Sequence, residues 1–330
     1  MSTPDSTPAI EFVGVSKRFG SEGEAAIGHL DLAIDDGELV TFVGPSGCGK
    51  TTSLRLINRL IEPTSGTVMV AGRDVQSVPL ETLRRDIGYV IQQVGLFPHR
   101  TVAQNIATVP KLLGWSKADI GERVEELADL VGLDRSILAR HPAALSGGQQ
   151  QRVGVARALA ARPAVLLMDE PYSAVDPVVR AHLQDELLDL HHRVGTTIVL
   201  VTHDIDEAVR LGDRVAVFAN GGRLAQYDTP DRLMASPADE FVESFLGADR
   251  QLRRLALRRL ADLPLTPADD ALTAATRDGA AIVLDGSLTG RNAVDEMLAA
   301  GVHTVAVRSG EDGPLLGSIT LDRLSGLLRA

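Results

Sequence analysis

A glycine-rich stretch of the sequence carries the residues of a phosphate-binding loop. Residues 44–51 read GPSGCGKT and match the pattern G-x-x-x-x-G-K-[ST]. Glycines allow such a loop to curl until its backbone N–H groups face a phosphate, and the helix that follows adds its positive N-terminal end. Lys50 would then reach the β- and γ-phosphates, and Thr51 would hold Mg²⁺. A glycine-rich turn without function is the alternative. It is disfavoured because an apolar strand pattern precedes the motif and a helical pattern follows it.

A second chemical signal is a pair of acids at the end of an apolar run, VLLMDE at residues 165–170. A buried strand would deliver Asp169 to its end, where the carboxylate can hold Mg²⁺ through water. Glu170 would polarise the attacking water as general base. Two acids after an apolar strand are common, so the pair alone does not distinguish a site from an ordinary strand end. Together with the loop at 44–51, it predicts the second half of a nucleotide-hydrolysing site.

A third motif, LSGGQQ at residues 145–150, has a serine followed by two glycines. Ser146 as a helix N-cap and the glycines as a turn would account for these residue types. These structural roles would not explain why the motif occurs in the same chain as the two motifs above. The chain here resembles the ATP-binding-cassette (ABC) ATPases, whose signature sequence is LSGGQ. Further elements of that family occur in family order, at Phe19, Gln92, residues 173–176 (SAVD) and His203.

The resemblance covers residues 10 to about 247, implies ATP and Mg²⁺ as cofactors, and assigns roles. Phe19 would stack on adenine, and Gln92 would sense the γ-phosphate or the Mg²⁺. His203 would contact the γ-phosphate and orient Glu170. The implied catalytic residues are Glu170, His203 and Gln92, and the implied Mg²⁺ ligands are Thr51, Gln92 and Asp169. The implied ATP-binding residues are Phe19, Gly44, Pro45, Ser46, Gly47, Cys48, Gly49, Lys50, Thr51, Thr52, Ser146, Gly147, Gly148, Gln149 and Asp176.

The resemblance also implies a homodimer of two head-to-tail copies. Each ATP would lie between the loop at 44–51 of one copy and Ser146, Gly147 and Gly148 of the other. Neither copy would hold a complete site alone, so hydrolysis would be coupled to closure of the dimer, and the closing motion could move a partner.

The elements that must position these residues are short apolar runs separated by helical stretches. We expect strands at residues 10–19, 38–43, 66–70, 87–91, 164–168, 196–201 and 214–218. We expect helices at residues 50–60, 102–113, 117–131, from 146 onward, 177–194 and 204–211. This alternation indicates a mostly parallel sheet covered on both faces. The expected fold class is α/β, a P-loop NTPase ABC cassette with a mixed sheet core and a helical subdomain inserted at about residues 100–160.

Composition shifts predict four segments. Residues 1–9 are rich in Ser, Thr and Pro and are expected to be disordered, and the ABC ATPase domain spans 10–247. A linker helix and a linker follow at 248–279, and a small α/β extension occupies 280–330.

The extension resembles one cystathionine-β-synthase (CBS) motif, in residues 299–308 (AAGVHTVAVR) and 313–324 (GPLLGSITLDRL). The adenosine-binding version of that motif has an acid three residues after Thr320, where this chain has Arg323. We therefore expect a dimerising or regulatory module rather than a nucleotide site. Four arginines of the linker helix expected at 251–263 could bind anionic lipid and sense ionic strength, but a solvated helix is favoured. They are Arg253, Arg254, Arg258 and Arg259.

Bulk composition narrows the function classes. The net charge of −11 argues against broad binding to nucleic acid, because phosphate backbones are held by clustered Lys and Arg. One cysteine among 330 residues excludes an internal disulfide framework and fits a reducing compartment. We recognise no secretory signal and no run of about 18 apolar residues, so we expect the chain at the cytoplasmic face of a membrane, as a peripheral subunit.

The remaining question is what the ATPase drives. ABC ATPases that act on nucleic acid or the ribosome usually have coiled coils, zinc-binding cysteines or two cassettes in one chain, and this sequence has none of these. Residues 94–106 (VGLFPHRTVAQNI) resemble the segment of importer ATPases that receives a helix of the membrane permease, with Leu96 and Phe97 as exposed apolar residues or as padding of the lobe interface. Residues 91–115 are similar to the glycine betaine/carnitine/choline importer ATPases, which implies a permease and a substrate-binding protein as partners. Import of polar amino acids or of another amine is the alternative.

Overall fold

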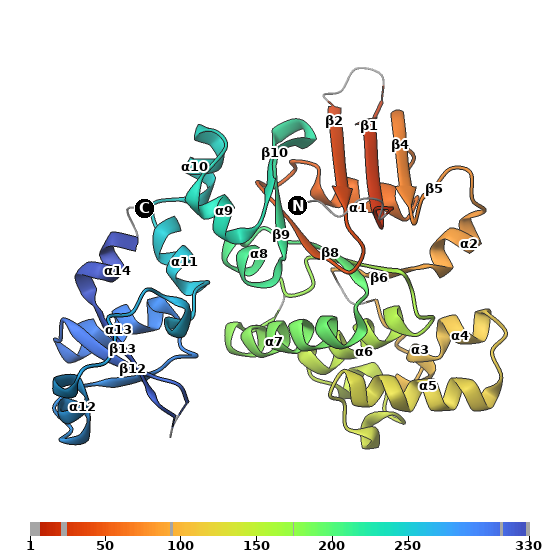
Figure 1. Ribbon diagram of the computed structural model, residues 1–330. Coiled ribbons are helices and arrows are strands. Elements are labelled where there is room, and N and C mark those ends of the chain that lie inside the picture. The colour runs from red at the N-terminus through yellow and green to blue at the C-terminus, as the bar shows by residue number, and fades with distance from the viewer. Residues whose placement is uncertain (1–6, 21–24, 93–94, 174, 311–312, 328–330) are drawn as a thin grey trace. The chain divides into compact units, whose positions relative to one another are not determined.

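The structure is a computed structural model that describes residues 7–20, 25–92, 95–173, 175–310 and 313–327 (Figure 1). Its chain divides into two compact units, residues 1–227 and 228–330, which is earlier than the expected boundary at residue 247. Most of the segment expected to be disordered lies outside the described residues. Its end differs from that expectation, because Ala9 is buried and its N–H donates to the carbonyl of Ile34 at 2.9 Å.

A six-stranded sheet forms the centre of the first unit, with the strand order β10-β9-β3-β8-β7-β6. The strands are β3 (Leu39–Val43), β6 (Ile87–Val90), β7 (Val165–Asp169), β8 (Thr197–Val201), β9 (Arg214–Ala219) and β10 (Arg223–Asp228). Neighbours from β6 to β9 run parallel. All five residues of β3, β7 and β8 are buried, as expected of a parallel sheet covered on both faces.

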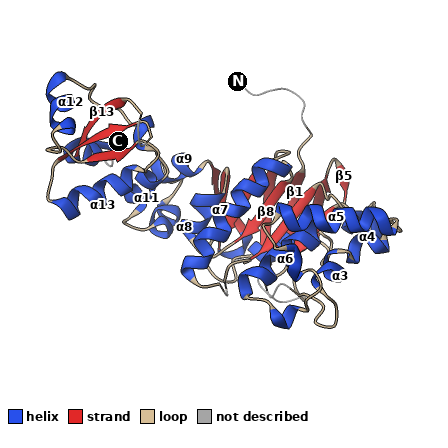
Figure 2. Ribbon diagram, turned by 90° about the horizontal axis from the view of Figure 1, so that it is seen from below, coloured by secondary structure: helices blue, strands red, loops and turns tan. Residues whose placement is uncertain are grey.

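Helices flank this sheet, and one group of them makes up the inserted helical subdomain (Figure 2). The helices of the first unit are α1 (Lys50–Ile57), α2 (Leu80–Arg85), α3 (Val102–Ile106), α4 (Thr108–Leu112), α5 (Lys117–Leu130), α6 (Gly147–Leu159), α7 (Pro177–Val194) and α8 (Ile205–Leu211). Short 3-10 turns lie at Arg135–Ile137, Pro142–Ala144 and Asn220–Gly222.

Two predicted helices differ from the observed ones. The helix expected at 102–113 is split into α3 and α4, because Pro110 has no N–H to donate to the carbonyl of Ile106. The helix expected at 50–60 ends at Ile57, and Arg59 then adopts a positive φ of 50°.

A second, four-stranded sheet has the order β2-β1-β4-β5. It comprises β1 (Ile10–Arg18), β2 (Ala25–Ile34), β4 (Ser65–Val70) and β5 (Arg73–Asp74), paired antiparallel. Strand β2 was not predicted. Leu30, Leu32 and Ile34 are buried in alternation, but a register shift between the partners of Leu30 and Ile27 interrupts the period of two. The parallel and antiparallel sheets together confirm the expected mixed core.

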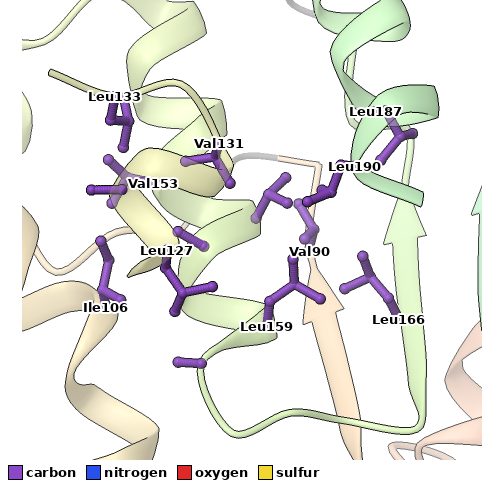
Figure 3. Close-up of a cluster of buried hydrophobic side chains, with 14 of the residues drawn as sticks. Val90, Ile106, Leu127, Val131, Leu133, Val153, Leu159, Leu166, Leu187 and Leu190 are labelled. Carbon is purple, nitrogen blue, oxygen red and sulfur yellow. The ribbon is translucent and has the colours of Figure 1, made fainter. Parts of the chain in front are cut away.

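The largest hydrophobic core joins the helical subdomain to one face of the six-stranded sheet (Figure 3). Figure 3 shows side chains from β6, β7, α3, α5, α6 and α7 pointing into this cluster, among them Val90, Ile106, Leu127, Val153, Leu159, Leu166, Leu187 and Leu190. The opposite face of the sheet belongs to a second cluster, since Val165 and Leu167 alternate with Leu166 along β7. Strand β7, which ends at Asp169, is thus fixed by packing on both sides.

The second unit has its own sheet and core. Its sheet order is β11-β12-β13, with β11 and β12 parallel and β12 and β13 antiparallel. The elements are α9 (Pro230–Ala235), α10 (Glu240–Leu246), α11 (Arg250–Ala256), a 3-10 turn (Leu260–Asp262), α12 (Asp270–Arg277), β11 (Val283–Asp285), α13 (Gly290–Ala300), β12 (Thr304–Arg308), β13 (Leu315–Thr320) and α14 (Leu321–Leu327).

Two expectations for the second unit change. The helix expected at 251–263 is α11 followed by a 3-10 turn, and the expected linker contains α12. Arg253, Arg254 and Arg258 are not simply solvated. Arg254 and Arg258 both donate to Asp231 at 3.0 Å, and a terminal nitrogen of Arg253 donates to the carbonyl of Leu246 at 2.5 Å. Among the described residues, no helix combines the length and apolar character needed to cross a bilayer.

Candidate active site

The loop at 44–51 joins β3 to α1 and requires glycine at two points of close approach. A Cβ atom on Gly44 would lie 2.2 Å from the carbonyl oxygen of Phe218, and one on Gly49 would lie 2.7 Å from that of Ala26. Gly49 also has a positive φ of 106° at the N-cap of α1. Because glycine has no side chain to cap the helix, the N–H groups of its first turn remain available to an anion.

Lys50 folds its side chain back over this loop. It is buried, and its Nζ donates to the carbonyl oxygens of Gly44 at 2.7 Å and Pro45 at 2.9 Å. The ammonium group and the backbone of the loop are therefore held together by these two hydrogen bonds.

Asp169 ends β7 and meets the residue that follows Lys50. The hydroxyl of Thr51 donates to Oδ1 of Asp169 at 2.9 Å, which joins two motifs 118 positions apart in the sequence. Burial raises the pKa of the Asp169 carboxyl above its ordinary value, and the hydrogen bond from Thr51 opposes that effect. Two side-chain oxygen atoms thus lie side by side at the edge of the phosphate loop.

The other two predicted catalytic residues, Gln92 and His203, lie around one oxygen atom of Glu170. Its Oε2 lies 3.2 Å from Nε2 of Gln92 and 3.3 Å from Nδ1 of His203. Gln92 follows β6 and His203 follows β8, the two neighbours of β7 in the sheet. Parallel strands end at the same edge, so the topology brings the three side chains together. Glu170 itself has a positive φ of 44°, and its N–H donates to the carbonyl of Val201 at 2.9 Å.

The signature residues occupy the start of α6. Ser146 is the N-cap, with its hydroxyl accepting from the N–H of Gln149 at 3.3 Å and its own N–H donating to the Gln149 side chain at 3.0 Å. The capping role is therefore present. A Cβ atom on Gly147 would meet nothing within 4 Å. Within the described parts of the chain, no hydrogen bond or ion pair links residues 146–149 to the phosphate loop at 44–52.

Phe19 and Asp176, two more of the predicted residues, lie at exposed positions, whereas Cys48 in the phosphate loop is buried. Phe19 follows β1, its side chain is 56% exposed, and the Nζ of Lys17 lies 5.0 Å from the centre of its ring. Asp176 precedes α7, where its carbonyl accepts from the N–H of Arg180 at 2.8 Å. An exposed ring is free to stack on a flat ligand.

Sequence reasoning missed several residues around the acids. Tyr89 and Arg55 lie near Asp169, and burial together with the charge of Asp169 raises the pKa of the Tyr89 hydroxyl. A cavity of about 30 Å³ is lined by Glu170 and His203 and also by Arg180, Thr202 and Glu207, among others. Helical spacing is the signal that could have found two of them, because Arg180 lies one turn after Asp176 and Glu207 one turn after His203.

The fold and these motifs define a nucleotide-binding protein of the α/β class with a phosphate loop. Residues 27–173 match the family described as ABC transporter. The chain is 54% identical over 239 residues to the osmoprotectant import ATP-binding protein OsmV of Salmonella typhimurium, covering 72% of this chain and 62% of that protein. It is 51% identical over 254 residues to the glycine betaine uptake system ATP-binding protein YehX of Escherichia coli, covering 77% of this chain and 82% of that one.

A solved structure is also similar. The dimeric ATP-binding cassette MJ0796 in a post-hydrolysis state bound to ADP and Pi has 33% identity and a TM-score of 0.59, with 67% of this chain and 98% of that chain covered. The chain therefore belongs to the family of ABC transporter ATP-binding proteins. The match spans 62% of the length of OsmV and 60% of the Listeria monocytogenes carnitine transport protein OpuCA.

Proposed function

We propose that this chain is the ATP-hydrolysing subunit of an ABC importer for a quaternary-amine osmoprotectant such as glycine betaine, carnitine or choline. The observation that carries the ATPase activity is the cluster around Glu170, whose Oε2 contacts Gln92 and His203 at the edge of the phosphate loop. The names of the relatives support the substrate class, because OsmV is an osmoprotectant import protein and YehX a glycine betaine uptake protein.

The residues fit ATP and Mg²⁺ as cofactors. Mg²⁺ is commonly held by one or two protein oxygens together with substrate phosphates and water, rather than by a full cage of side chains. Thr51 and Asp169 supply such a pair, 2.9 Å apart. The described residues contain no group of three or more His, Cys, Asp or Glu side chains arranged for a metal, which fits a site completed by the phosphates. When bound, Mg²⁺ neutralises the charge that develops on the phosphates.

The chain's own groups perform the other steps. Lys50 and the loop backbone hold the phosphates, and Phe19 stacks on the adenine. Glu170 accepts a proton from the attacking water as that water's oxygen bonds to the γ-phosphorus and the bond to the bridging oxygen breaks, releasing ADP. Gln92 and His203 hold the receiving oxygen in place and approach the γ-phosphate.

The active unit is proposed to be a head-to-tail homodimer. In one copy, Ser146 and Gly147 make no bond to the phosphate loop, whereas their open helix start suits a phosphate supplied by a second copy. MJ0796, which shares the fold, was solved as a dimer. Asp176, exposed before α7, would lie at the same interface, and closure would convert hydrolysis into motion.

The permease is proposed to dock on residues 95–106. The side chain of Asn105 is fully buried, where it accepts from the N–H of Phe97 at 2.8 Å and donates to the carbonyl of Phe97 at 3.2 Å. This segment is thus preformed. Phe97 is 37% exposed between the guanidinium groups of Arg100 and Arg157, whereas Leu96 packs against the core and pads the lobe as the alternative anticipated. A substrate-binding protein would complete the importer at the cytoplasmic membrane.

Residues 280–330 are proposed to be a regulatory or dimerising extension that resembles a CBS motif. Its core includes Leu284, Val305 and Ile319. The same core contains Leu255, Leu260 and Leu263, so the extension packs together with the segment that precedes it. Deletion of residues 251–330 tests whether this region senses ionic strength, since that role requires the salt dependence of transport to change. An unchanged salt dependence would remove the ionic-strength role.

The function is tested by uptake in salt-stressed host cells. Labelled glycine betaine, choline, carnitine, proline and histidine are compared between wild type and Glu170→Gln. Loss of betaine-type uptake in the variant supports the osmoprotectant importer. Loss of histidine uptake alone favours the amino-acid alternative. Equal uptake of all five in both strains contradicts the proposal, and co-purification then identifies the membrane partner.

A further inference from the structure

Arg180 connects two loops that meet at Glu170. It lies in the first turn of α7, and one guanidinium nitrogen donates to the carbonyl of Val175 at 3.1 Å. The other terminal nitrogen lies 3.8 Å from Oδ2 of Asp204, the residue after His203. One side chain therefore touches both the segment that follows Glu170 and the segment that carries His203.

Asp204 holds the His203 segment from the other side. Its Oδ1 caps α8 by accepting from the N–H groups of Asp206 at 2.9 Å and Glu207 at 3.4 Å, while its own N–H donates to Thr202 at 3.0 Å. The two carboxylate oxygens are thus divided between the helix and Arg180. The position of Arg180 is transmitted to the backbone beside His203.

The segment after Glu170 completes a closed series of contacts between Glu170, Arg180 and Asp204. The hydroxyl of Ser173 donates to the carbonyl of Glu170 at 3.0 Å, and the N–H of Val175 donates to Tyr172 at 3.1 Å. With the contact between His203 and Glu170, these bonds form a ring that runs from Glu170 through the turn, Arg180 and Asp204 back to Glu170. Removing Arg180 opens that ring at one point.

The ring has little bearing on stability. The side chains of Arg180 and Asp204 are 30% and 37% exposed, and solvent-exposed ion pairs contribute little to folding. Breaking the pair should therefore leave the protein folded and change its rate of ATP hydrolysis. Catalysis is sensitive to small displacements of the reacting groups that have little effect on stability.

We propose that Arg180 is a positioning residue that sets the orientation of His203 against Glu170 and couples it to the segment at 173–176. The inference rests on the proposed ATPase function. Since Asp176 in that segment is the residue expected at the contact with a second copy, Arg180 would make the hydrolytic pair responsive to dimer closure.

The test compares Arg180→Met, Arg180→Lys, Asp204→Asn and the Arg180→Met/Asp204→Asn double variant in the full-length chain. Asparagine keeps the helix cap but removes the charge that faces Arg180. Arg210→Met is the matched control, because Arg210 also joins α8 to α7, through Asp185 at 2.7 Å and Gln184 at 3.3 Å rather than through Asp204. Steady-state ATP hydrolysis, thermal unfolding and the imidazole resonances of His203, assigned with His203→Gln, are recorded for each.

We expect Arg180→Met to lower kcat about tenfold or more with less than about a twofold change in KM for ATP. Lysine should restore part of the activity, and the double variant should be no worse than the worse single variant. The Tm should move by less than about 4 °C, and the His203 resonances should shift in Arg180→Met but not in Arg210→Met. Equal kcat and unshifted His203 resonances in Arg180→Met would overturn the proposal. Absence of hydrolysis in the wild type would instead contradict the ATPase function, and the His203 resonances would still decide the role of Arg180.

Discussion

Nδ1 of His203 lies 3.3 Å from Oε2 of Glu170, although the two residues follow different strands, β8 and β7. Their contact follows from the pairing of β7 with β8, in which Asp169 lies opposite Val201. The N–H of Glu170 then donates to Val201, which fixes the backbone of the acid beside the histidine loop. The carboxylate is thus held in place by its neighbours, as the proposed role of Glu170 as general base requires.

Replacing Glu170 by glutamine should separate hydrolysis from binding. Glutamine keeps the shape of the side chain but cannot accept the proton, so we expect ATP hydrolysis to fall about 10²–10⁴-fold while ATP binding is spared. Phosphate release and binding of a fluorescent ATP analogue measure the two. Glu81→Gln, at a side chain that is 88% exposed, is the control and should leave both unchanged. Hydrolysis near the wild-type rate would remove Glu170 as the base.

Gly49→Ala should disrupt the phosphate loop. The added Cβ would lie 2.7 Å from the carbonyl oxygen of Ala26, and φ at this position is 106°. We expect ATP affinity to fall at least about tenfold and the free energy of unfolding to fall by about 1–3 kcal/mol. Isothermal titration and urea denaturation measure these quantities.

Gly121→Ala is the matched control for that change. Gly121 lies within α5, and a Cβ there would meet nothing within 4 Å. Because alanine favours a helix over glycine by about 1 kcal/mol, this variant should be slightly more stable and bind ATP normally. Equal behaviour of the two alanine variants would show that the loop tolerates a side chain at position 49.

The stability of Glu207→Gln relative to wild type should increase as the pH rises. Burial raises the pKa of the Glu207 carboxyl, opposed by hydrogen bonds that include the one from Gln184 at 2.9 Å. Because the pKa of Glu207 is higher in the folded state than in the unfolded state, the folded state binds the proton more tightly. The stability of the wild type therefore falls as the pH rises from the unfolded-state pKa to the folded-state pKa. The variant lacks this loss. Urea denaturation at pH 5 and pH 8 should show its relative stability increasing, and a pH-independent difference would contradict the assignment.

Asp231→Asn should have the opposite pH dependence in the second unit. The hydrogen bond from Arg254, with the charge of Arg258, lowers the pKa of the Asp231 carboxyl. Its contribution to stability is present above the unfolded pKa of about 3.9 and is lost as pH falls through the folded pKa. The variant should be less stable than wild type at pH 7, and the difference should shrink as the pH falls below the unfolded pKa. Melting curves at low and high salt test it further, because a carboxylate that is 43% exposed is partly screened.

Several features could be predicted because they depend on neighbouring residues in the chain. The phosphate loop needs glycines and a lysine at set spacings, and the buried strands β3, β7 and β8 are mostly apolar runs. Parallel pairing then brings Glu170, Gln92 and His203 to one edge. Strand β2 was missed because a register shift interrupts its period of two, and the break after Ile106 was missed because a proline was read through as helix.

Other features were decided by the tertiary structure. The amino-acid sequence by itself determined the motifs, the parallel sheet and the resemblance to ABC ATPases, since each depends on residue type and local spacing. It could not pair Arg180 with Asp204 or Arg254 with Asp231, because these contacts join separate helices whose approach depends on packing. Nor could it show that Leu96 packs on the core while Phe97 is exposed. A loop has no regular period of side-chain directions from which burial could be predicted. Local features depend on the order of neighbouring residues and can be predicted from it. Contacts between side chains far apart in the sequence form only once the hydrophobic core has brought their elements together.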